Sequence, residues 1–182
     1  MANTKNTLIA DRYSDALVDL AKEGKLTFDK IGTDLTLIKN ILEQSPDLNE
    51  ILSNPLTSVE NKKEIIEKVF TNEIDALIIN FLKVLVDKNR FFVFNDILDS
   101  FNIALDDINN ISRIRVTSAV EMTDESRNKL KNKLEEKLKK NVILDLNINS
   151  NIIAGLVIEM GDNVIDMSLK HKLEDLSKNI IR

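Results

Sequence analysis

Up to about residue 108 the apolar residues recur every three or four positions, which is the spacing that places side chains on one face of an α-helix. The clearest segment is 74–85, where apolar side chains fall at offsets 0, 3, 4, 7, 8 and 11. Five further segments show the same spacing: 9–21, 26–42, 48–52, 65–70 and 94–108. Together they predict six helices joined by short connections, as in an antiparallel bundle.

Residues that stop or start helices separate these segments. Gly24 follows the first apolar stripe and is well placed to end it, because glycine tolerates the left-handed conformation of a helix end. Pro46 and Pro55 bound the short third segment, since the residue before a proline resists helical geometry. The sequence 57–60, Thr-Ser-Val-Glu, has the form of a capping box and predicts the start of the fourth helix.

From Ile111 the period changes from helical to alternating, which is typical of strands with one solvated face. A strand is expected from 111 to about 120, with Ile114, Val116, Ser118 and Val120 on its inner face. Thr123 then caps a charged helix whose narrow apolar stripe would cover only one side of a sheet. The remaining expected elements are strands at 142–148 and 152–160, a hairpin turn at 161–163, a strand at 164–166, and a final helix capped by Ser168 and carrying Leu169, Leu173, Leu176 and Ile180.

The expected fold is therefore α+β and mainly α: a six-helix bundle over residues 1–110, followed by a small mixed α+β domain over 111–182. Composition supports the division. The first segment has 12 Lys and Arg against 19 Asp and Glu, whereas the second has 13 against 11. All eight aromatic residues precede Ser112.

The chemistry that is missing limits the function. The chain has no cysteine, one histidine and four glycines, so zinc sites and cysteine catalysis are excluded, and no glycine-rich phosphate loop is present. His171 lies between two lysines, where a solvated position is favoured over a catalytic one. The net charge of −5 argues against nucleic-acid binding. No apolar run approaches a membrane span, and the first residues lack a secretory signal, so we expect a cytoplasmic location.

Three charged groups offer alternatives, and each favours the simpler interpretation. Asp106 and Asp107 are adjacent on a helix, so they diverge instead of converging as an acid/base pair. Asp162 and Asp166 flank the hairpin, but no further oxygen ligand follows at a calcium-loop spacing. The lysines of 129–140 are interrupted by glutamates and lack aromatic neighbours, which favours a solvated face over an RNA or lipid contact. We expect no catalytic residue, metal or cofactor.

Two helices of the bundle suggest a partner. Tyr13 and Ala16 lie on neighbouring turns and form a small-residue notch where a foreign helix could lie. Val84 and Val86 lie off the main stripe of the fifth helix, which makes that helix apolar on more than one face. Because a second apolar face must also be buried, a partner helix in a groove is a natural candidate.

Several stretches resemble one family across essentially the whole chain: the delta subunit of the bacterial F-type ATP synthase, equivalent to the mitochondrial oligomycin-sensitivity-conferring protein. The stretches are Arg12–Leu17, Asn54–Leu56 with the following Lys62–Lys63, Asn80–Arg90, Thr117–Ala119 and, most specifically, Ile153–Ser168. The last is similar to the pattern I-G-G-x-x-I-x-x-G-D-x-V-I-D-x-S. It departs from that pattern at Ala154 and Met167. The first stretch resembles the pattern R-Y-A-x-A-L and departs from it at Ser14.

The resemblance implies a non-catalytic subunit of the peripheral stalk, which holds the catalytic head against the torque of the rotating shaft. The helical domain would bind N-terminal helices of the alpha subunits through Tyr13, Ala16, Asn80 and Val84. The second domain would grip the b-type stalk subunits, shaped by Ala154, Gly155, Gly161, Asp162, Asp166 and Ser168. Contact with the membrane would be indirect, on the cytoplasmic side of a plasma membrane or at a thylakoid.

Two other classes of function compete with this one. A soluble regulatory adaptor would bind helices without belonging to a rotary complex. An enzyme would need one of the carboxylates to support turnover. Stoichiometric co-purification with the catalytic head separates the stalk subunit from the adaptor, and turnover abolished by changing a single Asp or Glu would identify the enzyme.

Overall fold

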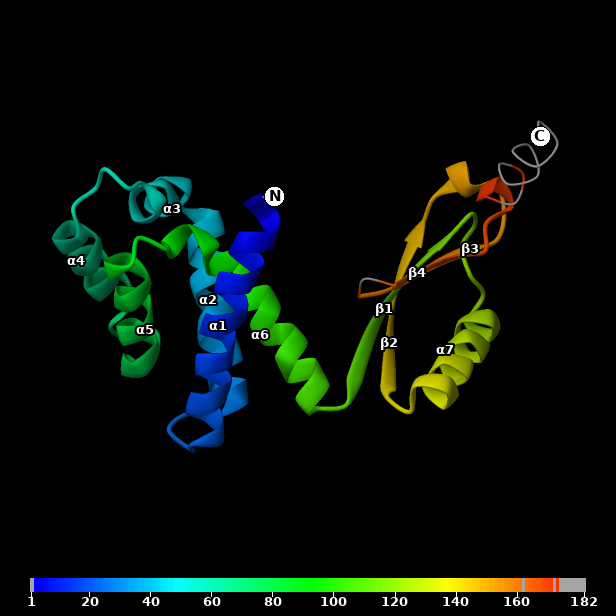
Figure 1. The fold of residues 1–182 in the computed structure, drawn as a ribbon, viewed down its shortest axis with the longest axis horizontal. Helices are drawn as coiled ribbons and strands as arrows, with labels where there is room; N and C mark the ends of the chain where they lie inside the picture. Colours follow the sequence, from blue (N-terminus) through cyan, green and yellow to red (C-terminus); the bar gives the residue numbers. More distant parts are fainter. Residues whose placement is uncertain (1, 162, 172, 174–182) are drawn as a thin grey trace. The chain divides into compact units, whose positions relative to one another are not determined.

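The computed structural model describes residues 2–161, 163–171 and 173 (Figure 1). The chain divides into two compact units, Met1–Leu105 and Asp106–Arg182. The first is helical and the second contains a four-stranded sheet, so the predicted mainly-α, α+β class is confirmed. Over the described residues, no helix combines the length and the apolar character needed to cross a bilayer.

Each of the six predicted helical segments coincides with an α-helix, although Leu26 and Ile74 precede the helices to which they were assigned. The helices are α1 (Ala2–Lys22), α2 (Phe28–Gln44), α3 (Pro46–Ser53), α4 (Val59–Phe70), α5 (Ala76–Asp87) and α6 (Phe94–Ile108). A short 3-10 helix, η1 (Phe91–Val93), precedes α6 and was not predicted. The core of this unit is made by the apolar stripes of the helices, and its largest fully buried side chains include Leu17, Ile31, Ile66, Phe70, Leu82 and Phe101.

The helix ends follow local backbone chemistry. Gly24 has φ +71°, and the Lys25 amide donates to the Leu20 carbonyl at 3.1 Å, so the predicted end of α1 is confirmed. The capping box needs a correction at its first position. Ser58, not Thr57, is the N-cap of α4 and accepts a hydrogen bond from the Asn61 amide at 3.3 Å. Thr57 still belongs to the preceding turn, because its amide donates to the Asn54 carbonyl.

A buried carboxylate fixes the start of α5. Asp34 of α2 is only 1% exposed, and its Oδ2 accepts a hydrogen bond from the Asp75 amide at 2.9 Å. Its Oδ1 accepts one from Lys30 Nζ at 2.7 Å. Asp75 is the N-cap of α5, and its own carboxylate accepts from the Leu77 amide. Because buried charges need partners, this arrangement ties α5 to α2 at one defined position.

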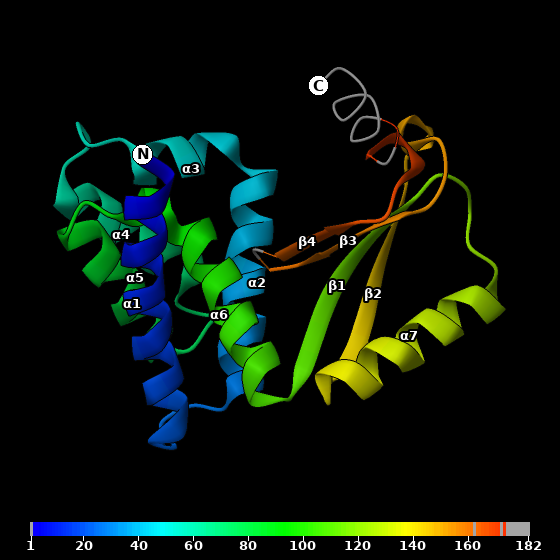
Figure 2. The ribbon, with the colours of Figure 1, turned by 45° about the vertical axis from the view of Figure 1, so that its right-hand side comes forward.

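The second unit is a sheet with one helix against it (Figure 2). Its elements are β1 (Ile111–Ser118), α7 (Asp124–Leu138), β2 (Asn141–Ile148), the 3-10 helix η2 (Ser150–Ile152), β3 (Leu156–Met160) and β4 (Asn163–Asp166). The strand order is β2-β1-β3-β4. β1 and β2 are parallel, and the other two pairs are antiparallel. Thr123 accepts from the Ser126 amide at 3.3 Å, so the predicted cap of α7 is confirmed.

The sheet has one apolar face, packed with the inward residues of α7. The buried residues of this second core are Ile114, Val116, Leu134, Val142 and Ile158. The prediction that the narrow stripe of α7 covers one side of a sheet is therefore confirmed. The strand register places Arg113 and Arg115 on the opposite face, beside Ile143 and Asp145 of β2.

Two predicted strands are shorter than expected. β1 ends at Ser118, and Val120 is 71% exposed instead of facing inward. The strand expected from residue 152 begins only at Leu156, because Ile153 (φ +67°) and Gly155 (φ +93°) adopt positive φ, which no β-strand allows. Gly161 has φ +56° at the expected hairpin turn between β3 and β4.

The start of the expected final helix is described, and the rest is not. Ser168 Oγ accepts a hydrogen bond from the His171 amide at 3.1 Å, as the predicted cap requires. Leu169 and Leu173, two of the leucines expected on this helix, are 41% and 49% exposed. Leu176 and Ile180, like Asp162, lie outside the described residues.

Candidate partner-binding surfaces

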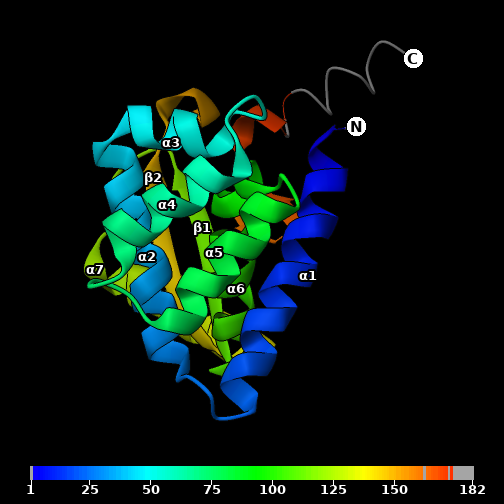
Figure 3. The same ribbon diagram turned by 90° about the vertical axis from the view of Figure 1, so that its left-hand side faces the viewer.

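An aromatic contact joins the two helices that were expected to bind a partner helix. Figure 3 shows the ribbons of the two helices, α1 and α5. Tyr13 of α1 meets Phe81 of α5 edge-on, with ring centroids 6.0 Å apart and an interplanar angle of 79°. Arg90, just after α5, lies over the Tyr13 ring at 5.9 Å and donates to its hydroxyl at 3.3 Å. Such edge-on and cation–π contacts fix the orientation of the rings. The half-buried Tyr13 is therefore held against α5.

The other three predicted residues are exposed beside this contact. Ala16 lies one turn after Tyr13 on α1, and Asn80 and Val84 lie one turn apart on α5. Val84 exposes 45% of its surface, which is high for a branched apolar residue. We call Tyr13, Ala16, Asn80 and Val84 the α1/α5 surface. The structure brings these residues onto two helices in contact, and their role in binding remains a prediction.

Val84 and Val86 differ in exposure, contrary to the prediction. Val86 was expected to share the second, partner-facing side of α5 with Val84, but it is 1% exposed and belongs to the core. α5 packs against α2, α4 and η1, so the core itself covers more than one face of the helix. Only Val84 of the pair is available to a partner.

Sequence reasoning also missed two residues that shape the α1/α5 surface. Phe81 was assigned only to the apolar stripe, and Arg90 was noted only as the end of a resembling stretch. Neither contact is local, because Tyr13 and Arg90 are 77 residues apart in the chain. Nothing in a single sequence indicates that an arginine after α5 will contact a tyrosine on α1.

Ion pairs brace α5 against α4 on the same side of the unit. Lys63 Nζ lies 2.6 Å from Asp87, and Lys83 Nζ lies 2.6 Å from Glu67. The hydrogen bond from Lys83 lowers the pKa of Glu67. Because these side chains are partly exposed, each ion pair contributes little to the free energy of unfolding. Together the two pairs restrain the orientation of α5 relative to α4.

The first unit also has an open hollow of about 530 Å³ between α2 and α6. Its lining includes Phe28, Gly32 and Thr36 from α2 and Asn102 and Leu105 from α6. It was not predicted, because these residues do not form a continuous apolar stripe.

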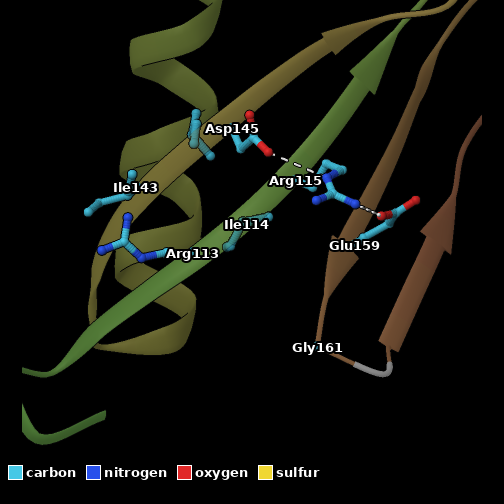
Figure 4. Close-up of a pocket in the computed structure, with 8 residues that line it drawn as sticks. Arg113, Ile114, Arg115, Ile143, Asp145, Glu159 and Gly161 are labelled. Atoms are coloured by element: carbon cyan, nitrogen blue, oxygen red, sulfur yellow. Dashed lines mark hydrogen bonds and ion pairs between the residues drawn. The ribbon is translucent and has the colours of Figure 1, made fainter. Parts of the chain in front are cut away.

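The face of the sheet opposite α7 carries a row of charges across three strands (Figure 4). Arg115 of β1 lies between two carboxylates, 3.4 Å from Asp145 of β2 and 3.6 Å from Glu159 of β3. Arg113 Nε and Nη2 donate to Asp106 at 2.5 and 3.1 Å, and this interaction raises the pKa of Arg113. With Ile143 and Gly161, these arginines line an open hollow of about 550 Å³.

Several charged groups of this unit are paired with one another. Asp106 pairs with Arg113, while Asp107 lies 2.7 Å from Lys140, so the two adjacent aspartates diverge as predicted. Each has a cationic partner, however, and is not simply a solvated helix end. Among the described residues no three His, Asp or Glu side chains are grouped to hold a metal ion. Lys129 and Lys131 pair with Glu125 and Glu135 along α7.

The residues of the family-like stretch meet at one end of β3. Gly155 has φ +93°, and a Cβ there would lie 2.4 Å from the Met167 carbonyl oxygen. The Ala154 carbonyl accepts from the Leu169 amide at 2.8 Å, and Asp166 Oδ1 accepts from the Ser168 amide at 2.8 Å. Hydrogen bonds from Ser168 lower the pKa of Asp166. Close packing and hydrogen bonds therefore hold one turn together, and they involve Ala154, Gly155, Asp166 and Ser168. Gly161 belongs to the separate hairpin between β3 and β4.

Comparisons with known proteins agree with this architecture. The sequence model of the ATP synthase delta (OSCP) subunit matches residues 9–180. The chloroplastic ATP synthase subunit delta of Galdieria sulphuraria is 37% identical over 171 residues, which cover 93% of this chain and 96% of that protein. The ATP synthase subunit delta of Chlorobium chlorochromatii (strain CaD3) is 33% identical over 170 residues, 93% and 94% of the two chains.

A solved structure has the same fold. A chain of the Toxoplasma gondii mitochondrial ATP synthase hexamer superposes with a TM-score of 0.70 at 20% identity, over 95% of this chain and 97% of that one. Proteins named delta or OSCP subunit are structural, non-catalytic parts of ATP synthase. By the match over nearly its whole length, this chain belongs to the ATP synthase delta (OSCP) subunit family.

Proposed function

We propose that this chain is a peripheral-stalk subunit that links the alpha/beta catalytic head of a proton-translocating F-type ATP synthase to the b-type stalk subunits. The observation that carries the proposal is its construction from two units, each with its own hydrophobic core. A protein that resists torque between two bodies needs a separate attachment to each. Large apolar contacts suit such a permanent assembly, because permanent interfaces are larger and more hydrophobic than transient ones.

The first attachment is the α1/α5 surface, which binds an N-terminal helix of an alpha subunit. Exposed Val84 supplies apolar area, and Ala16 lets a helix backbone approach closely. Tyr13 is already fixed by Phe81 and Arg90, so binding costs little side-chain entropy at that position. In this proposal residues 1–110 serve the head, and residues 111–182 serve the stalk.

The second attachment is made by the sheet unit, which grips the b-type subunits. The family-like turn at Ala154–Ser168 shapes this unit, and most of its contacts are internal. The chain meets the membrane only through the complex, on the cytoplasmic side of a plasma membrane or at a thylakoid. Relatives named for bacterial and chloroplastic ATP synthases support both settings.

Calorimetric titration of the full chain with the N-terminal peptide of the cognate alpha subunit tests the first attachment. We expect saturable one-to-one binding that is lost in Ala16→Asp, because the carboxylate would be desolvated against an apolar helix. Asn49→Asp on α3 is the matched control, since it adds the same charge at an exposed helical position outside the α1/α5 surface. Equal binding by Ala16→Asp would show that the surface is misplaced.

A helix-binding adaptor is the competing function, and it predicts the same titration. The two differ in the cell, where a stalk subunit co-purifies with the catalytic head in constant proportion. Peptide binding without such co-purification would favour the adaptor.

A further inference from the structure

The outer edge of β2 presents backbone groups without strand partners. β2 is an edge strand, and it pairs only with β1. The Asn141 amide donates to Asn110 and the Asn149 amide donates to Ser118, so odd-numbered residues turn their amides toward β1. Because successive residues of a strand alternate, the even-numbered residues from Val142 to Ile148 turn theirs outward.

Within the part of the chain that the structure describes, a hydrogen-bond acceptor is found only for the first of these outward amides. The Val142 amide donates to Glu135 Oε1 of α7 at 3.0 Å. Within the described residues, no hydrogen bond of the outward amides of Leu144, Leu146 and Ile148 is found. β2 also has no proline, lysine or bulge, the features that commonly protect an edge. The opposite edge strand, β4, is protected by its length of only four residues.

Pairing of β2 with a second copy of itself is disfavoured by charge. In an antiparallel pair, outward residues face outward residues, so full overlap of 142–148 is centred on Asp145. Asp145 would then face its own copy in a non-hydrogen-bonded pair, where side chains are closest and like charges repel. Arg115 does not cancel this charge, because it is shared with Glu159 and the three groups keep one negative charge.

The same charge suits a foreign strand with a basic residue opposite Asp145. Ile143, two residues before Asp145 on the same face, is 42% exposed, and Ile148 at the end of the strand is 58% exposed. Both would gain apolar neighbours from an added strand. We propose that the free edge of β2 takes up an extended segment of a b-type stalk subunit as a fifth strand, with a Lys or Arg beside Asp145. This inference rests on the proposed function, because it names the stalk as the partner.

Residue-resolved amide hydrogen exchange of the full chain, with and without purified cognate b-type subunits, tests the inference. The amides of Leu144, Leu146 and Ile148 should exchange at least about tenfold more slowly in the complex, because each gains a hydrogen bond. The Val142 amide, already bonded to Glu135, should change less.

Two variants separate backbone pairing from charge. Ile148→Pro removes one outward amide and leaves the ladder to β1 intact, as proline allows on an edge strand, and should weaken binding about tenfold. Asp145→Lys should also weaken it, whereas Glu121→Lys, an exposed charge reversal outside β2, should not. If the chain binds b-type subunits but the three amides do not exchange more slowly, and Ile148→Pro binds as well as the wild type, strand pairing at β2 is wrong. The proposed stalk function would still hold in that case. If the wild-type chain does not bind b-type subunits, both the strand pairing at β2 and the proposed stalk function are contradicted.

Discussion

Replacing Gly155 with alanine should destabilise the second unit much more than replacing Gly161, although both glycines have positive φ. At Gly161 (φ +56°), the described residues other than its chain neighbours place no heavy atom within 4 Å of an added Cβ. The cost there is the left-handed conformation alone, about 1 kcal/mol. At Gly155 (φ +93°) the Cβ would lie 2.4 Å from the Met167 oxygen and 3.1 Å from Ser168 Cα. Both are backbone atoms, so the turn itself must move.

The magnitude at Gly155 combines conformational strain with this overlap. Strain contributes about 1–2 kcal/mol, and displacing a packed segment typically adds about 1–3 kcal/mol. We therefore expect a loss of about 2–5 kcal/mol, a large part of the stability of a small unit. The hydrogen bonds from Leu169 to Ala154 and from Met167 to Leu156 would be disturbed first.

Urea unfolding with two probes measures this loss. Tyr13, the only tyrosine, reports on the first unit by fluorescence because the chain has no tryptophan, and far-ultraviolet circular dichroism reports on both units. Gly155→Ala should lower the midpoint of the second unit by about 1 M or more and leave the Tyr13 transition unchanged. Equal shifts for Gly155→Ala and Gly161→Ala would refute the reasoning from close approach.

Three further predictions concern charged groups. Lys62 is 2% exposed and burial lowers its pKa, so Lys62→Met should raise stability by about 1 kcal/mol at pH 7. The cost of burying the cation disappears as pH rises through the ordinary lysine pKa, so urea unfolding near pH 11 should show a smaller gain. Asp34→Ala should cost about 2–3 kcal/mol in the Tyr13 transition, because the Asp75 amide and Lys30 lose their acceptor. The pKa of Asp166 lies below its ordinary value because of Ser168, so its contribution is present above the unfolded pKa and is lost as pH falls through the folded pKa. A carboxyl carbon NMR titration should show this pKa rising in Ser168→Ala, and an unchanged value would contradict that cause.

Apolar spacing predicted the helices well because burial of one face decides where a helix forms. The 74–85 stripe became α5, and Gly24 and Thr123 mark helix ends where local hydrogen bonds alone determine the outcome. The strand expected from residue 152 failed for a different reason. From Ile152 to Ile158 it has no polar side chain, so no alternation could reveal the positive φ of Ile153 that delays the start of β3.

The candidate surfaces were harder to predict from the sequence, because they depend on contacts between residues that are far apart along the chain. Exposed Val84 and buried Val86 look alike in a sequence, and only the packing of α5 against three neighbours distinguishes them. Tyr13 was found through a resemblance and a helical spacing, but its contact with Arg90 follows from the tertiary fold. Likewise, the free edge of β2 depends on the strand order, which alternation does not specify.

Reconstitution of the link itself tests the central claim most directly. Purified catalytic head and b-type subunits are mixed with the wild-type chain, the Ala16→Asp protein or no added chain, and the assemblies are resolved by sedimentation. We predict one assembly containing head, chain and b-type subunits with the wild-type chain, and only chain with b-type subunits for Ala16→Asp. Head and b-type subunits that co-sediment equally well without the chain, or a chain that joins neither, would contradict a linking role.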